Sequence, residues 1–184
     1  MSRTTRMLTQ GAIMVALATI LSLFTLYQLP NGGSVTFASM APIIVISLLY
    51  PFRWAFLTAF AYSLVQMLLG FVPPPSQTFL SFVAVILLDY VVAFSGLSLA
   101  GPISRRIGKP ICGAVVGTCL VSLLRLGCSF LSGILIWDIY APEGTPVWIY
   151  SITYNGSYMI PEMVVTAIVV ALVVKYIPLK QLSA

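Results

Sequence analysis

The sequence has no histidine and very little charge. Only 7% of its 184 residues are charged and 60% are hydrophobic, whereas soluble domains carry about 25% charged residues. Without histidine the chain can form neither a Ser-His-Asp triad nor a histidine-ligated zinc site, and the phosphate-binding pattern Gly-x-x-x-x-Gly-Lys-[Ser/Thr] is absent as well. We therefore predict that the protein is not an enzyme, uses no metal or cofactor, and depends on another chain for any ATP hydrolysis.

Cysteine is also scarce, and its three copies do not form a metal-ligand pattern. Cys112, Cys119 and Cys128 lie in one apolar stretch at spacings of seven and nine residues, which are not the spacings of a zinc site. We expect them to be small packing residues on one helix.

Long apolar runs fill nearly the whole chain instead. A helix of about 20 apolar residues crosses the roughly 30 Å hydrocarbon core of a bilayer, and turn-forming Pro and Gly separate such runs here, for example at Pro73-Pro74-Pro75 and Gly101-Pro102. The predicted fold is an all-α membrane protein, with one integral membrane domain over residues 1–184. Its six transmembrane helices are expected at 7–27, 39–49, 54–72, 79–99, 111–137 and 158–177.

The first apolar run follows two arginines, as the apolar part of a signal peptide does. Its core is longer than the roughly 7–15 residues of a signal sequence, and no small-residue cleavage site follows Tyr27. We therefore expect residues 7–27 to be a spanning helix.

Basic residues lie on one side of the predicted topology. The opposite loops lack Lys and Arg and carry Asp138 and Glu143, with Glu162 expected close to the outer end of the last helix. Positive residues mark the cytoplasmic side, so both termini are predicted to be cytoplasmic in a plasma membrane. The net charge of +5 then reflects topology and attraction to anionic lipid, and nothing in it indicates nucleic-acid binding. The residues on the basic side, eight of the nine Lys and Arg, are Arg3, Arg6, Arg53, Arg105, Arg106, Lys109, Lys175 and Lys180.

A single acid, Asp89, lies inside the predicted helix 79–99. A bare carboxylate at this depth costs on the order of 3 kcal/mol, and intramembrane ionisable groups are functional candidates for that reason. Arg125, at a similar depth in the predicted helix 111–137, could form a structural ion pair with it. Alternatively, Asp89 faces a cavity and neutralises a cationic ligand.

Aromatic residues cluster around the last external loop. An aromatic belt at the membrane surface explains some of them. A ligand site is the alternative, because stacked rings, an amide and a carboxylate below them suit a flat heteroaromatic cation. The cluster consists of Trp137, Tyr140, Trp148, Tyr150, Tyr154, Asn155 and Tyr158.

The first helix carries a strip of small residues, Ala12-x-x-x-Ala16 followed by Ala18. Small residues let membrane helices approach closely. The strip is therefore either an internal packing surface or a docking surface for another membrane subunit.

Three ordered motifs make the chain similar to a known family. They are Gly32-Gly33-Ser34-Val35-Thr36-Phe37-Ala38-Ser39-Met40-Ala41-Pro42, Leu87-Leu88-Asp89-Tyr90-Val91-Val92-Ala93-Phe94, and Tyr140-Ala141-Pro142-Glu143-Gly144 followed by Tyr150-Ser151-Ile152-Thr153-Tyr154-Asn155-Gly156-Ser157-Tyr158. With the helix count and loop lengths, they resemble the thiamine-specific S-component of energy-coupling factor (ECF) transporters. The resemblance implies a bacterial membrane subunit that binds its vitamin from outside and then joins a transmembrane T-component and two ABC ATPases.

The resemblance also implies roles for individual residues. Asp89 would be the binding-site acid, a glutamate in other members. Where many members have a histidine on the fifth helix, this chain has Ser129. The remaining implied roles are Tyr90 beside the acid, Trp137 and Tyr150 stacking on the ligand, Asn155 binding the pyrimidine, a gating loop with Gly32, Gly33, Ser34 and Ser39, and docking through Ala12 and Ala16.

Two other functions stay open at this stage. The same architecture could bind pyridoxine or a thiamine precursor, because the histidine is absent and the acid is one methylene shorter. A stand-alone carrier could instead use Asp89 as a proton site, although no inverted repeat is visible in the sequence. An intramembrane enzyme is disfavoured, since no nucleophile has a base beside it.

Overall fold

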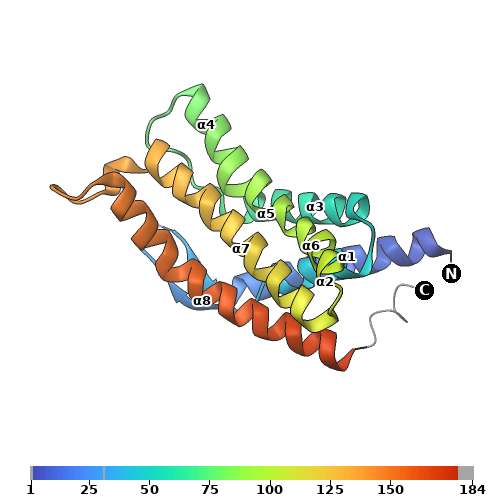
Figure 1. Ribbon diagram of the computed structural model, residues 1–184. Helices are drawn as coiled ribbons and strands as arrows, with labels where there is room; N and C mark the ends of the chain where they lie inside the picture. Colours follow the sequence, from blue (N-terminus) through green and yellow to red (C-terminus); the bar gives the residue numbers. More distant parts are fainter. Residues whose placement is uncertain (1, 31, 178–184) are drawn as a thin grey trace.

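The computed structural model describes residues 2–30 and 32–177. In this part of the chain, five helices are long and apolar enough to cross a membrane (Figure 1). Four are α1 (Arg3–Leu23), α3 (Phe52–Gly70), α7 (Pro110–Leu135) and α8 (Val147–Tyr176), and the fifth is a composite helix over Phe79–Ile107. The composite helix consists of α4 (Phe79–Val85), the π-helical η1 (Ile86–Val92), α5 (Ala93–Ser95), the 3₁₀ turn η2 (Gly96–Leu99) and α6 (Ala100–Ile107). The predicted membrane-helix architecture is confirmed in these five helices.

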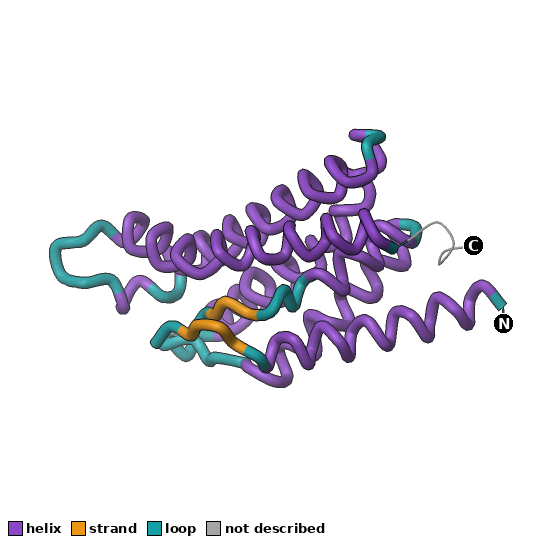
Figure 2. The backbone as a smooth tube through the Cα atoms, turned by 90° about the horizontal axis from the view of Figure 1, so that it is seen from below, coloured by secondary structure: helices purple, strands orange, loops and turns teal. Residues whose placement is uncertain are grey.

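The predicted second helix is shorter than a membrane span. It is α2 (Ala41–Leu49), whose nine residues rise only about 14 Å. A β-hairpin that the sequence did not predict precedes it in the otherwise mostly helical structure: β1 (Thr25–Gln28) pairs antiparallel with β2 (Ser34–Thr36) (Figure 2). At the far end of α2, the Tyr50 hydroxyl donates to Gln10 in the first half of α1. Through the hairpin and α2, the chain therefore runs back alongside α1 toward the end where α1 begins.

Three of the differences from the predicted helix boundaries bear on the fold and the site. Helix α1 ends at Leu23 rather than residue 27, because Thr25 already pairs with Thr36 in the hairpin. The Gly101-Pro102 pair does not stop the composite helix, since Pro102 falls in the first turn of α6, where a backbone N–H has no helical partner. Helix α8 begins at Val147 instead of residue 158, so the aromatic cluster after residue 147 is helical and not a loop.

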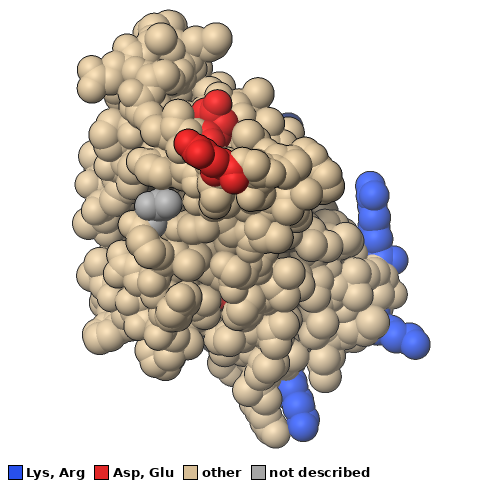
Figure 3. Space-filling model, turned by 90° about the vertical axis from the view of Figure 1, so that its left-hand side faces the viewer, with Lys and Arg blue, Asp and Glu red and all other residues tan. Residues whose placement is uncertain are grey.

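The start of α1 and the end of α8 lie at the same end of the bundle (Figure 1), and basic residues mark that end. The opposite end carries the α7–α8 connection, with its short 3₁₀ turn η3 (Asp138–Tyr140), and acidic side chains are visible there in Figure 3. Lys180, named in the sequence prediction, lies outside the described residues. The described basic residues of the marked end are Arg3 and Arg6 in α1, Arg53 in α3, Arg105 and Arg106 in α6, Lys109 before α7 and Lys175 in α8.

Helix backbones touch directly at this basic end. A Cβ on Gly101 would lie 1.8 Å from the carbonyl oxygen of Ser47 in α2, and one on Gly117 would lie 2.7 Å from the carbonyl oxygen of Ala100. The Ser47 hydroxyl in turn accepts the Gly101 N–H at 3.0 Å. Only glycine allows such an approach. Helices α2, α6 and α7 are therefore closely packed at the basic end, opposite the end that carries the hairpin.

Candidate functional site

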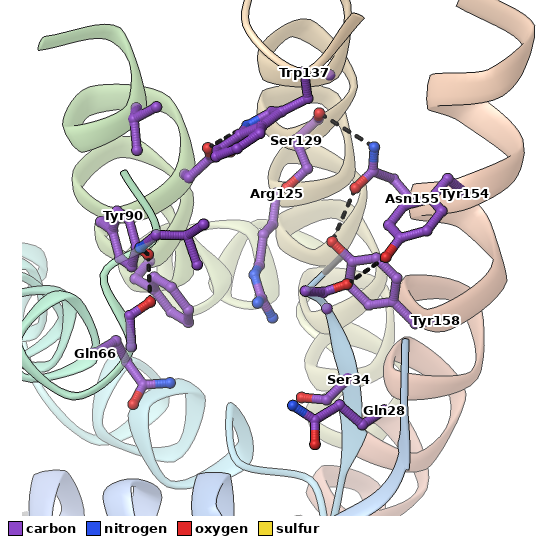
Figure 4. A pocket seen from close by; sticks show the side chains of 18 of the residues that line it. Gln28, Ser34, Gln66, Tyr90, Arg125, Ser129, Trp137, Tyr154, Asn155 and Tyr158 are labelled. Atoms are coloured by element: carbon purple, nitrogen blue, oxygen red, sulfur yellow. Dashed lines mark hydrogen bonds between the residues drawn. The ribbon is translucent and has the colours of Figure 1, made fainter. Parts of the chain in front are cut away.

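A cavity of about 600 Å³ lies between the hairpin and the ends of α1, α3, η1, α7 and α8 (Figure 4). Its volume is in the usual range for sites that bind small molecules. Ser39 does not line it, and Ala12 and Ala16 lie elsewhere. The sequence-predicted residues that line the cavity are Asp89, Tyr90, Ser129, Trp137, Tyr150, Asn155, Gly32, Gly33 and Ser34.

Asp89 lies in the π-helical segment of the composite helix, opposite α7. Its Oδ2 accepts a hydrogen bond from the Ser132 hydroxyl at 2.7 Å and one from Trp137 Nε1 at 3.3 Å. No basic side chain among residues 2–30 and 32–177 pairs with it, and Oδ1 has no hydrogen-bond donor in that part of the chain. π-Helical turns recur at functional sites because they displace side chains from the regular helical positions. One carboxylate oxygen, Oδ2, is thus hydrogen-bonded, and the other, Oδ1, remains available.

Tyr90, the next residue, stabilises the cavity wall. Its hydroxyl donates to the Gly70 carbonyl at 2.7 Å and accepts the Val72 N–H at 3.2 Å, at the end of α3. Its ring packs against Phe71, with centroids 5.9 Å apart. Since the hydroxyl is already bonded, Tyr90 offers the cavity mainly its ring.

Helix α8 presents a row of polar aromatic side chains to the cavity. Tyr150, Tyr154 and Tyr158 recur every four residues, and the Tyr150 and Tyr154 rings are 5.5 Å apart. Asn155, from the same helix, donates through Nδ2 to the Ser151 carbonyl at 2.9 Å and to the Ser129 carbonyl at 3.3 Å, and its Oδ1 accepts from the Tyr158 hydroxyl at 2.9 Å. The amide is therefore fixed in orientation before any ligand arrives.

The hairpin contacts this same helix through two residues near its turn, Gly32 and Gly33. The Tyr154 hydroxyl donates to the Gly32 carbonyl at 2.7 Å. Gly33 has a positive φ of 85°, and a Cβ there would lie 2.6 Å from the Tyr158 ring. Both glycines have a positive φ that favours glycine in the chain reversal, and Gly33 is also required by the close contact with Tyr158.

A third attachment lies one turn deeper and corrects the prediction for Glu162. Instead of lying near the outer surface, Glu162 is only 2% exposed, in the interior of α8. Its carboxylate accepts the Thr36 N–H at 2.5 Å and the Thr36 hydroxyl at 2.6 Å. Ser39 donates its N–H to Thr36 Oγ1 at 3.1 Å and is buried, so it supports this attachment and does not line the cavity.

Arg125 lines the cavity below Ser129 and does not pair with Asp89 in the described part of the chain. Its guanidinium carbon lies 4.4 Å from the centroid of the Phe94 ring, and Nη1 is 3.2 Å from the sulfur of Met40. The structural ion pair considered from the sequence is therefore not formed.

A second hollow, about 690 Å³ and almost wholly apolar, lies on the outside of the bundle between α1 and α3. Ala12 and Ala16 line it, beside the buried Gly11. The small-residue strip thus leaves a groove on the membrane-facing surface, and only Gly11 and Ala18 of α1 are buried.

Sequence reasoning named Tyr150, Tyr154 and Tyr158 but placed them around a loop, and it missed other contributors to the site. The four-residue spacing of Tyr150, Tyr154, Tyr158 and Glu162 is a helical signal that places all four on one face. Gln28 and Gln66, which also line the cavity, carry no motif that could have singled them out.

The chain was compared with known families and proteins. A family model described as "Thiamine transporter protein" (Thia_YuaJ) matches residues 8–181. The chain belongs to the thiamine transporter family. This confirms the family resemblance seen in the sequence, and the family is one of transporters rather than of enzymes.

Individual members of the family align over most or part of the chain. It is 37% identical over 174 residues to the thiamine transporter ThiT of Bacillus subtilis (strain 168), covering 88% of this chain and 86% of the relative. It is 29% identical over 101 residues to ThiT of Lacticaseibacillus paracasei, half of each chain. The solved structure of ThiT from Listeria monocytogenes matches with a TM-score of 0.76 and 22% identity over 99% of both chains, which shows a shared fold. The protein is accordingly a multi-pass bacterial membrane protein.

Proposed function

We propose that this protein is the thiamine-binding S-component of an ECF transporter, a single membrane domain that takes thiamine from outside into the cavity. The observation that carries this is Asp89: a carboxylate inside a membrane helix that faces a cavity, is held by Ser132 and Trp137, and has no salt-bridge partner among the described residues. Thiamine carries a permanent thiazolium charge. Its binding would neutralise a carboxylate that is costly to leave alone in this setting.

The other lining residues suit the rest of thiamine. Trp137 and Tyr150 would contribute ring faces to the two heteroaromatic rings, and a cation over such a face gains about 0.5–2 kcal/mol. Asn155 Oδ1 keeps one acceptor position beyond its bond from Tyr158, which suits the aminopyrimidine. Ser129, a smaller side chain than histidine, lines the cavity together with Asn155.

The hairpin would act as the gate. Gly32, Gly33 and Ser34 form part of the cavity wall, and α8 holds them through Tyr154 and Tyr158. Ligand entry would require these contacts to open, while the deeper bond from Thr36 to Glu162 keeps the base of the hairpin in place. Ser39 would support that base rather than touch the ligand.

Energy would come from partner chains. Ala12 and Ala16 on the outer groove would dock against a transmembrane T-component, which in turn carries two ABC ATPases. We infer six membrane crossings, the hairpin and α2 together making the second, with both termini in the cytoplasm beside the basic residues.

Binding to the Asp89→Asn variant tests the site. Asparagine keeps the shape and removes the charge, so thiamine affinity should fall at least tenfold, about 1.4 kcal/mol, while the purified protein stays folded. Titration by tryptophan fluorescence reports on the site because Trp137 lines it. Asp138→Asn, at an exposed acid after α7, is the matched control and should bind normally. An unchanged affinity in Asp89→Asn would rule out the counter-ion role.

Two further measurements separate the alternatives. Pyridoxine and hydroxymethylpyrimidine, which lack the thiazolium charge, should bind more weakly than thiamine in the same titration. Vesicles containing this chain alone should take up no thiamine under a proton gradient, because transport requires the ATPase subunits. Proton-driven uptake by the chain alone would contradict the S-component assignment.

A further inference from the structure

The acid of the cavity is fixed through only one of its two oxygens. The carboxylate of an aspartate turns about a soft torsion that has no sharply preferred angle, so hydrogen bonds must set the direction of its oxygens. Asp89 Oδ2 accepts the Ser132 hydroxyl at 2.7 Å and Trp137 Nε1 at 3.3 Å. Because both bonds converge on Oδ2, they leave Oδ1 for a ligand.

The bond from Ser132 is the better formed of the two. Its length of 2.7 Å is ideal for an O–H···O bond, whereas the 3.3 Å from Trp137 Nε1 exceeds the usual range for N–H···O. The single indole N–H is also shared, since the Ser132 hydroxyl oxygen lies 3.1 Å from it. The Ser132 hydroxyl therefore donates to the acid and accepts from the indole, and the three side chains form a closed triangle.

Ser132 does not itself reach the cavity. Its side chain is fully buried, and it is not one of the residues that line the cavity. Thr118, another buried hydroxyl residue of α7, bonds the carbonyl one turn earlier in its own helix, whereas the Ser132 hydroxyl bonds across to the composite helix. Any influence of Ser132 on a ligand must therefore pass through Asp89 and Trp137.

The backbone that carries Ser132 is itself held in place. The next residue, Gly133, lies against α8, where an added Cβ would be 2.2 Å from Ser151 Oγ. The Ser151 hydroxyl donates to the Phe130 carbonyl of α7 at 2.9 Å. Helices α7 and α8 are thus in close contact on either side of Ser132, so its hydroxyl is presented from a fixed position.

We propose that Ser132 is a positioning residue for the ligand, which holds the carboxylate of Asp89 and the ring of Trp137 in one arrangement. The inference rests on the proposed function, in which Asp89 receives the thiazolium and Trp137 offers a ring face. With both groups fixed in advance, one bound cation is neutralised and stacked at the same time, and little freedom is lost on binding. Ser132 thereby raises the affinity for the cationic ring without touching it.

Ser132→Ala tests this against a matched control, Ser122→Ala. Ser122 is buried in the same helix, lies outside the cavity wall and has no hydrogen-bond partner in the described part of the chain. Each variant loses one buried hydroxyl, but only Ser132→Ala should weaken thiamine binding, by about tenfold, as expected for a hydrogen bond to a charged group. Hydroxymethylpyrimidine, which lacks the cation, should lose little affinity. Ser132→Thr, which keeps the hydroxyl, should bind thiamine more tightly than Ser132→Ala.

Two backgrounds show whether the effect passes through the triangle. In Asp89→Asn, adding Ser132→Ala should cost little further affinity, because the charge that Ser132 positions is already absent. The tryptophan emission of the ligand-free protein should shift in Ser132→Ala and not in Ser122→Ala, since Trp137 Nε1 loses a hydrogen-bond partner. This shift should vanish in a Trp137→Phe background.

The outcomes separate this inference from the proposed function. If the wild-type chain binds thiamine and Ser132→Ala binds it as tightly as Ser122→Ala does, Ser132 is not a positioning residue and the thiamine site stands. If Ser132→Ala weakens thiamine and hydroxymethylpyrimidine equally, it acts on the fold and the inference is again wrong. If the wild-type chain binds no thiamine, both proposals fail. Should Ser132→Ala not fold, Ser132→Cys, which has a similar size and a weak donor, takes its place and should show the same selective loss.

Discussion

The two ends of the bundle are built in opposite ways. At the cavity end the backbone is irregular, with a hairpin, a π-helical turn and a 3₁₀ turn. Polar side chains there form hydrogen bonds between segments that are far apart in the sequence. At the basic end α2, α6 and α7 are in backbone contact, with Gly101 against Ser47 and Gly117 against Ala100. The first end has space and hydrogen bonds, and the second has close packing.

This difference separates two tasks within one small chain. Closely packed helices resist deformation, so the basic end can hold the helices while the gate that we propose at the cavity end opens and closes. Hydrogen bonds such as those of Tyr154 to Gly32 and Thr36 to Glu162 are individually modest, about 1 kcal/mol each, or more where a charge takes part. They can be broken one at a time, as a gate requires. Substitutions at the basic end should therefore affect stability, and those at the cavity end should affect ligand binding.

The largest expected effect is that of Gly101→Ala. The added Cβ would lie 1.8 Å from the Ser47 carbonyl oxygen, and α2 cannot move away because Ile43, Ile44 and Ile46 are fully buried. Overpacking of this kind costs about 1–3 kcal/mol or more. We expect a marked loss of folded protein in size-exclusion chromatography after heating in detergent.

Gly127→Ala is the matched control for that variant. Gly127 is also helical, in α7, but a Cβ there meets nothing within 4 Å. Alanine should leave stability unchanged or raise it by up to about 1 kcal/mol through helix propensity. If Gly101→Ala were as stable as Gly127→Ala, the close packing of the basic end would not be what supports the fold.

A smaller effect, on binding rather than folding, is expected for Gly33→Ala. Alanine at φ +85° is strained by roughly 1 kcal/mol or more, and its Cβ would meet the Tyr158 ring at 2.6 Å. That ring cannot turn freely because its hydroxyl is bonded to Asn155. The hairpin should be displaced from α8, and thiamine affinity should fall about tenfold with little change in thermal stability.

Gly32→Ala separates the two causes of this loss. Gly32 has a similar φ of +90°, but a Cβ there has nothing within 4 Å. It therefore carries the backbone strain without the ring contact, and should weaken binding less than Gly33→Ala does. Equal losses in the two variants would show that backbone strain alone, and not the contact with Tyr158, determines how the hairpin closes.

The same contrast between the ends explains which features the sequence could predict. Apolar runs and charge segregation are properties of whole helices, so α3, α7 and the composite helix were predictable to within a few residues, except where Gly101-Pro102 was read as a break. Asp89 was identifiable because an acid in an apolar run is conspicuous. The cavity residues Trp137, Tyr150 and Asn155 were named from the aromatic cluster, and the family resemblance implied their individual roles.

What the sequence did not reveal depends on contacts between distant segments. The hairpin replaces the end of a predicted helix because Thr25 and Tyr27 pair with Thr36 and Val35, and no apolar run indicates that pairing. Glu162 was placed near the surface because the start of α8 was predicted 11 residues late. Its true role depends on Thr36, 126 positions earlier in the chain.

The smallest effect is expected for Glu162→Gln, at the base of the hairpin. The carboxylate accepts two hydrogen bonds from Thr36, on separate oxygens; glutamine has one acceptor oxygen, so its amide nitrogen would face one of the two donors. Losing one such bond costs on the order of 1 kcal/mol, about a fivefold change in an equilibrium. Thiamine should dissociate about fivefold faster in a stopped-flow chase, because the hairpin opens more readily.

Glu143→Gln, at an exposed acid of the α7–α8 connection, is the control and should dissociate at the wild-type rate. Thr36→Val removes the hydroxyl that donates to Glu162 and keeps the backbone N–H, so its dissociation rate should resemble that of Glu162→Gln. In the double variant, the increase in the dissociation rate should be smaller than the product of the two single increases. If the two effects multiplied fully, Glu162 and Thr36 would act independently. The gate would then be held only by its upper contacts with Tyr154 and Tyr158.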